Sequence, residues 1–194
     1  RRGELGWTQT ELVRKAGMLA YAAKHGLEVK ATAKQPWSSD DNLLHISYEA
    51  GILEDPWLSA PDEIFERMVH PTKAPDAIER FIIHWESGVP VKVSAVVATS
   101  DTREGVVVSV YESGKVLADG LEAVFNYVDA AASRNGVGSL GMVETRYVGM
   151  KSRGEYHAPG HTVLLHAHRD IEGLCLTGSL ILEKGRRMPD FAAR

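Results

Sequence analysis

The sequence contains one run of residues that could bind a metal ion, His166-Ala167-His168-Arg169-Asp170. Imidazole and carboxylate groups are zinc ligands, and metallo-hydrolases carry a similar H-x-H-x-D run on a loop after a strand. Those enzymes have a further His directly after the Asp, where this sequence has Ile171. If the segment is helical, His166 and His168 point about 200° apart and cannot share one ion. The sequence therefore predicts no metal site here.

A second run, Gly136-Val137-Gly138-Ser139-Leu140-Gly141, matches the G-x-G-x-x-G pattern of dinucleotide-binding loops. That pattern indicates a dinucleotide site only when it follows a strand and opens a helix, because the phosphates then lie at the helix N-terminus. Here a helical stripe precedes the glycines and a short strand, Leu140 to Val143, follows them. We therefore interpret the glycines as a helix stop and a tight turn, without a bound dinucleotide.

The composition narrows the class of protein. Of the 194 residues 44% are hydrophobic and 25% are charged, which is typical of a globular chain with one substantial core. A net charge of −4 provides no broad positive field, so we expect no nucleic-acid partner. The single cysteine, Cys175 in a Leu-Cys-Leu run, cannot form an internal disulfide and is expected to be a small buried residue rather than a nucleophile.

No stretch of the sequence is apolar over the roughly 18 residues that a membrane span needs, and the charged N-terminus leads into no signal-peptide core. We therefore expect a cytoplasmic protein without membrane contact.

Helical periodicity is clearest in three segments. Thr8 to Glu11 has capping-box spacing and opens a helix that Gly26 ends, and a short strand follows over Leu27 to Thr32. An apolar stripe from Leu121 to Ala132 predicts a helix that is capped at Asn135-Gly136. The third helix is expected from Pro159 to Leu174, with Val163, Leu164, Ala167, Ile171 and Leu174 on one apolar face.

The region between the first two of these helices is expected to be mostly β. Residues 35–61 predict ordered loops with short elements, and Pro61 opens a brief helix through Met68. Strands are expected over 78–85 and 89–97, joined by a turn at Glu86-Ser87-Gly88, and over 105–111, closed by Ser113-Gly114. This mixed order of strands and helices predicts an α+β fold.

Three segments, Pro36 to Pro56 with its P-W-S and H-I-S-Y-E motifs, Gly136 to Gly138, and Val143 to Tyr156, resemble argininosuccinate synthetases. The resemblance extends from about Ala22 to Glu172. Long matches in loop-like sequence are specific, because packing alone seldom dictates loop residues. Two departures are the Thr at 145, where the family usually has Asn, and an insertion over about 96–120 that adds a hairpin.

The resemblance implies a citrulline site made of Ser38, Ser47, Glu144 and Tyr156. Citrulline carries an α-ammonium, an α-carboxylate and a neutral ureido group, which need an anionic acceptor, donors and hydroxyl-type partners respectively. Glu144 is the only acid of the four, so we expect it to hold the ammonium while the others supply hydroxyls. Taken singly, Ser38 could be a cap, Ser47 a turn donor, Glu144 a surface strand end and Tyr156 a cover for the core.

The activity implied by the resemblance is ATP-dependent ligation of L-citrulline and L-aspartate to argininosuccinate, with release of AMP and pyrophosphate. The family's Ser-Gly-Gly-x-Asp pyrophosphate loop and its aspartate-binding Gly-Asn-Asp segment occur nowhere in this sequence. ATP, with Mg, is therefore expected to be bound mainly by another domain, and the chain alone is expected to be inactive. Lys151 and Arg153 could face a phosphate-bearing ligand or form structural ion pairs.

For the domain organisation, we expect residues 1–34 to be the last helix and strand of an α/β nucleotide-binding domain. Residues 35–194 would be the synthetase domain, which binds citrulline and mediates multimerisation, truncated at its C-terminus. The start without Met suggests an excised piece. A homotetramer is implied by the family. The alternative is a non-catalytic amino-acid-binding or scaffold module that has kept the pocket and lost the ATP domain.

Overall fold

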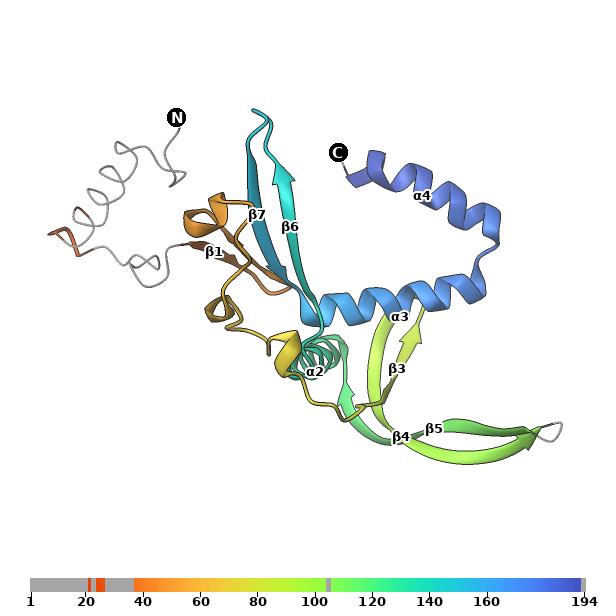
Figure 1. The fold of residues 1–194 in the computed structure, drawn as a ribbon. Helices are drawn as coiled ribbons and strands as arrows, with labels where there is room; N and C mark the ends of the chain where they lie inside the picture. Colours follow the sequence, from red (N-terminus) through yellow and green to blue (C-terminus); the bar gives the residue numbers. More distant parts are fainter. Residues whose placement is uncertain (1–20, 22–23, 27–36, 104–105, 193–194) are drawn as a thin grey trace. The chain divides into compact units, whose positions relative to one another are not determined.

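The computed structural model describes residue 21 and residues 24–26, 37–103 and 106–192. Most of the predicted first helix and the strand predicted over 27–32 lie outside these residues. The chain divides into two compact units, one made of the residues up to Arg67 together with Ser139–His157, the other of Met68–Gly138 and the residues from Ala158 onward. Both strands and helices occur in the described residues, in the mixed order that predicted an α+β fold (Figure 1).

The first unit is built on a four-stranded antiparallel sheet in the order β1-β2-β7-β6. Its strands are β1 (Ser38–Asp41), β2 (Ile46–Glu49), β6 (Ser139–Thr145) and β7 (Lys151–His157). Between β1 and β2, the side-chain oxygen of Asn42 accepts hydrogen bonds from the backbone N–H groups of Leu44 and His45, at 2.9 and 3.1 Å. Such an Asx turn supplies a tight reversal without glycine. Strands β1 and β2 are thus the short elements that the sequence predicted within 35–61.

Apolar side chains gather on one face of this sheet. Ile46 and Tyr48 alternate along β2 with polar residues, so both point to the same side. They form a buried cluster with Trp37, Leu53 and Ile64. The last two of these come from two short 3-10 helices, Gly51–Glu54 and Asp62–Ile64.

The helix predicted from Pro61 to Met68 is wrong in its length, because the 3-10 helix ends at Ile64. Phe65 leaves the helical conformation with ψ of 57°. Its ring packs instead against the His157 ring on β7, with the centroids 4.6 Å apart. A tertiary ring contact therefore replaces the last turn of the predicted helix.

The second unit contains a three-stranded meander of β3 (Phe81–Glu86), β4 (Val89–Arg103) and β5 (Val106–Asp119), with β4 in the middle. The predicted turn at 86–88 is confirmed, and Ser87 and Gly88 both have positive φ, 50° and 80°. Two successive positive φ values are typical of the turn that joins tightly connected antiparallel strands. Strands β4 and β5 continue past β3 as a two-stranded hairpin, the one predicted for the insertion (Figure 1).

The predicted end of the third strand at Ser113-Gly114 is wrong, since β5 continues to Asp119. The pairing of β4 with β5 shifts register on both sides of Ser94, which marks a bulge. A Cβ on Gly114 would lie 2.9 Å from Cγ2 of Val97 on β4. Gly114 therefore permits a close approach of two strands within the ladder, rather than a turn that ends it.

Helices α2 (Leu121–Arg134) and α3 (Pro159–Cys175) confirm two of the predicted helices and pack on each other. The predicted cap of α2 is also confirmed: Gly136 has φ of 65°, and the N–H of Val137 reaches the carbonyl of Ala132 at 3.0 Å. The core of this unit is a cluster of Val93, Ala118, Val124 and Val128, covered by Phe81, Ile83, Tyr127, Val163 and Leu164.

The expectation of a buried Cys175 is wrong, and Leu174, which was expected on the apolar face of the helix, does not belong to the core. Leu174 is 88% exposed and Cys175 is exposed as well. Only the first half of α3 contributes to the core, through Val163 and Leu164, and its last turn continues beyond that cluster. The sequence also did not predict the helix that follows, α4 (Gly178–Ala192). Among the described residues, no helix has the length and apolar content that crossing a membrane requires.

Candidate functional site

The four residues of the predicted citrulline site all lie in the sheet of the first unit: Ser38 on β1, Ser47 on β2, Glu144 on β6 and Tyr156 on β7. Residues directly paired on antiparallel strands point to the same face, and so do residues two apart along one strand. The strand register therefore determines whether the four side chains can act together.

Ser47 stands at the centre of this register. It is paired with Tyr156 on β7 and with Asp40 on β1, so the three side chains form a row across one face. Ser38 lies two residues before Asp40 and shares that face. The Ser38 hydroxyl donates to the backbone carbonyl of Glu49 on β2 at 3.1 Å. Ser38 therefore bridges two strands and does not cap a helix. Ser47 lies within β2 and is not a turn residue.

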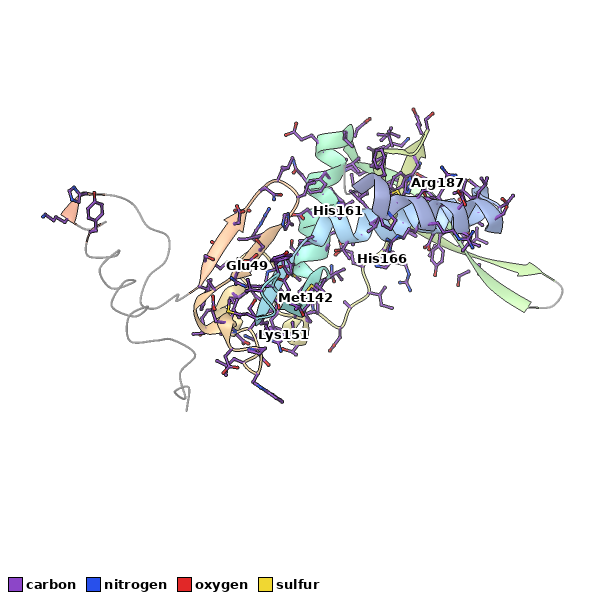
Figure 2. The ribbon with its side chains drawn as sticks, turned by 90° about the horizontal axis from the view of Figure 1, so that it is seen from above. Glu49, Met142, Lys151, His161, His166 and Arg187 are labelled. Atoms are coloured by element: carbon purple, nitrogen blue, oxygen red, sulfur yellow. The ribbon has the colours of Figure 1, made fainter. Side chains whose placement is uncertain are left out.

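Glu144 belongs to the same face. It is paired with Ser152, which lies an even number of residues from Tyr156 along β7. All four predicted residues thus emerge on the side of the sheet opposite the apolar cluster, and we call this side the polar face. Figure 2 labels two further residues of the polar face, Glu49 on β2 and Met142 on β6.

Tyr156 and Glu144 are in direct contact. The Tyr156 hydroxyl donates a hydrogen bond to Oε1 of Glu144. Burial, followed by this bond and the negative charges of Glu144 and Glu49, raises the pKa of Tyr156 to about 12. The phenol is therefore a proton donor throughout the neutral range, and it fixes one carboxylate oxygen of Glu144.

Gly154 provides the space for this contact. It is paired with Met142 on β6 and lies two residues from Tyr156 on the polar face. A Cβ at Gly154 would be 2.7 Å from both Cε2 and the hydroxyl oxygen of Tyr156, which shows that the ring lies across this glycine. The alternation of Ser152, Gly154 and Tyr156 signals the face, but the ring's path over the glycine is evident only from the structure.

The opposite face of β7 carries a buried pair of polar side chains behind the site. Glu155 and His157 are 5% and 0% exposed, and His157 Nε2 lies 3.2 Å from Oε1 of Glu155. Gly141 on β6 is paired with Glu155, and a Cβ there would lie 2.6 Å from Oε2. This glycine therefore makes room for a buried carboxylate, much as Gly154 makes room for a phenol.

Two further polar groups line this buried side. Arg153 Nη2 donates to the carbonyl of Pro56 at 2.9 Å, a structural contact rather than an exposed position for a phosphate. Burial, and then the charges of Glu66 and Asp41, raise the pKa of Tyr48 to about 12. Lys151 Nζ donates to the hydroxyl of Thr145 on the neighbouring strand. Lys151 and Arg153, the two cations considered for phosphate contact, thus both have a hydrogen-bond partner within the first unit.

The H-x-H-x-D run at 166–170 and the glycine run at 136–141 have local structural roles. His166, labelled in Figure 2, and His168 both lie within α3, so the helical condition that separates their side chains is met. His168 stacks edge-on with Trp85 at 5.4 Å and lies 3.5 Å from Glu172. Within 37–103 and 106–192, no three His, Cys, Asp or Glu side chains are grouped so as to hold a metal ion. The glycine run begins after α2 and its last three residues, 139–141, are the start of β6, so that a helix comes first and a strand second, as predicted.

Comparison with known proteins identifies the family. Residues 37–187 match the model of the arginosuccinate synthase C-terminal domain. The chain belongs to the argininosuccinate synthase family. It is 45% identical over 159 residues to the argininosuccinate synthase of Gallus gallus and 43% identical over the same length to that of Schizosaccharomyces pombe; each match covers 82% of this chain and 34% of the relative.

The argininosuccinate synthase of Thermotoga maritima is 37% identical over 190 residues, which is 96% of this chain and 42% of that relative. The chain therefore spans about a third to two fifths of the length of these curated relatives. The resemblance that the sequence motifs indicated is thus confirmed at the level of the family.

Proposed function

We propose that this chain supplies the citrulline site for ATP-dependent ligation of L-citrulline and L-aspartate, the reaction that forms argininosuccinate, AMP and pyrophosphate. The observation that carries the proposal is the common polar face of Ser38, Ser47, Glu144 and Tyr156. Membership of the argininosuccinate synthase family supports the same reaction.

In this proposal Glu144 receives the α-ammonium of citrulline. The Tyr156 hydroxyl occupies Oε1, and a carboxylate has further acceptor positions on both oxygens that an ammonium can use. Holding the carboxylate in one orientation before the ligand arrives lowers the entropy cost of binding. The Ser47 hydroxyl can donate to a carboxylate or ureido oxygen, while the Ser38 hydroxyl, which donates to the carbonyl of Glu49, keeps lone pairs that can accept from a ureido N–H.

The catalytic contribution of the polar face is positioning. The ureido oxygen of citrulline attacks the α-phosphate of ATP and pyrophosphate leaves; the aspartate amine then attacks the ureido carbon and AMP leaves. Both steps depend on the orientation of two reactants and on stabilisation of phosphoryl charge. Anchoring the amino-acid end of citrulline at Glu144 fixes the position of the ureido end, so that its oxygen can be held in line with the α-phosphate of a nucleotide. ATP, with Mg, and aspartate are bound outside the polar face.

A chimera tests this function. The portion of the Thermotoga maritima synthase that aligns with this chain is replaced by the chain itself, since the alignment covers 96% of it. We expect the chimera to form argininosuccinate from citrulline, aspartate and ATP, and the same chimera with Glu144→Gln to need much more citrulline. A folded chimera that binds citrulline but forms no product would favour the non-catalytic amino-acid-binding module. A folded chimera that binds no citrulline would contradict the site.

A further inference from the structure

Tyr156 reaches Glu144 along an unusual path. Its ring does not stand away from the sheet but lies along β7, above the position two residues earlier. Three atoms of the Tyr156 side chain would lie within 3.0 Å of a Cβ at Gly154, namely the ring atoms Cε2 and Cζ and the hydroxyl oxygen. Real Cβ atoms do not approach other heavy atoms so closely, so the ring can take this position only above a glycine.

The backbone of Gly154 does not require glycine. The glycines of this chain with positive φ are found at other positions of the described residues, and Gly154 lies inside a regular antiparallel pair with Met142. Glycine within a strand costs conformational entropy and offers no side chain for packing. Gly154 thus weakens the strand by itself, and its presence is explained by the Tyr156 ring that lies above it.

We propose that Gly154 is a positioning residue of the citrulline site, whose missing side chain lets the Tyr156 ring lie flat and hold Glu144 in its binding orientation. This inference rests on the proposed function as far as citrulline is concerned. It deepens that function by naming a residue that touches no ligand and yet determines where two ligand-binding groups stand.

The first measurement does not involve citrulline. The pKa of Tyr156 is about 12 while the ring is half-buried and bonded to Glu144, against an ordinary value of 10.0. In Gly154→Ala the added methyl displaces the ring, so the pKa of Tyr156 should fall toward 10.0. Labelled tyrosine Cζ resonances report this at pH 11, where a tyrosine of pKa 12 is about 90% protonated and one of pKa 10 about 10%. An unchanged Tyr156 resonance at that pH in Gly154→Ala overturns the proposal.

The second measurement is a double-mutant cycle on citrulline affinity. Gly154→Ala should weaken citrulline by about two- to twelve-fold, the range that corresponds to the net contribution of one typical hydrogen bond, because Glu144 itself remains and only its orientation by Tyr156 is lost. In a Tyr156→Ala background, where there is no ring to displace, Gly154→Ala should change the affinity less than two-fold. Equal losses in both backgrounds would mean that the methyl acts without Tyr156 and would contradict the proposal. Gly173→Ala, where a Cβ meets nothing within 4 Å, is the matched control.

The two measurements separate the possible failures. If the wild-type chain binds no citrulline, the proposed function fails, while the titration of Tyr156 still decides whether Gly154 positions the ring. If Gly154→Ala does not fold, the double variant Gly154→Ala/Tyr156→Ala must fold, because its ring is gone. Failure of both variants to fold overturns the proposal.

Discussion

Substitution of Gly141 by Ala should destabilise the protein through a buried carboxylate on the far side of the sheet from the site. The new Cβ would lie 2.6 Å from Oε2 of Glu155, and ordinary contact would require the carboxylate to retreat by several tenths of an ångström. Glu155 is 5% exposed, so its carboxylate cannot move into solvent without leaving His157 behind. The substitution therefore pushes the Glu155 carboxylate out of the position in which it lies against His157.

The cost of Gly141→Ala in the free energy of unfolding follows from the polar atoms of His157 that lose their partner. Nδ1 of His157 already lacks a hydrogen-bond partner among the described residues, so loss of Glu155 leaves both ring nitrogens of a fully buried histidine unpaired. An unpaired buried polar group costs about 1–3 kcal/mol. We therefore expect a loss of about 1–3 kcal/mol in the free energy of unfolding, against the roughly 5–15 kcal/mol of a typical domain.

Urea unfolding of the wild type and Gly141→Ala measures this difference. Gly185→Ala on α4 is the control, because a Cβ there meets nothing within 4 Å. Replacing a mid-helix Gly by Ala should stabilise by up to about 1 kcal/mol. A change of less than about 0.5 kcal/mol in Gly141→Ala, the usual range for surface substitutions, would refute the role given to Glu155 and His157.

Two further predictions concern activity and acid stability. The 194-residue chain, mixed with citrulline, aspartate and MgATP, should release no pyrophosphate in a coupled phosphate assay, because the sequence lacks a phosphate-cradling Ser-Gly-Gly-x-Asp loop; steady turnover would show that expectation to be wrong. The hydrogen bond from Arg134 lowers the pKa of Glu79 below 4.5, so this pair stabilises the fold at neutral pH and the contribution disappears as the pH falls through the lowered pKa. Arg134→Ala should thus be less stable than wild type at pH 7 by about 0.2–1 kcal/mol, with the difference shrinking below pH 4.5 in denaturant titrations. A difference that is the same at pH 7 and at pH 3 would exclude this linkage, and Arg187→Ala, which removes an exposed pair with Glu183, is the control.

Helices α2 and α3 could be predicted from the sequence because their apolar residues recur at helical spacing and their ends carry clear caps. Helix α4 could not, since Gly185 and the internal Pro189 are signals against a helix. Strand β7 escaped prediction for another reason: its buried residues are polar or lack a side chain, as with Ser152, Gly154 and Glu155. A method that depends on the periodicity of apolar residues cannot recognise such a strand.

The candidate site was predictable in its residues but not in its geometry. The residue types came from a family resemblance, and each of the four matched by type. Their common face depends on the pairing of β2 with β7, two strands far apart in sequence, and no local pattern determines such a register. The contact of Tyr156 with Glu144 over Gly154 requires that register too, and was therefore not expected from the sequence.

The most direct test of the citrulline site is to titrate L-citrulline by calorimetry into the full synthase chimera and into its Glu144→Gln and Tyr156→Phe variants. Removing one partner of a carboxylate–ammonium pair typically costs about 2–5 kcal/mol, and a neutral hydroxyl contact about 0.5–1.5 kcal/mol. We therefore expect Glu144→Gln to weaken citrulline by at least about thirtyfold and Tyr156→Phe by about two- to twelve-fold, with ATP affinity unchanged in both. Equal and negligible losses in the two variants would mean that citrulline does not bind at this face of the sheet.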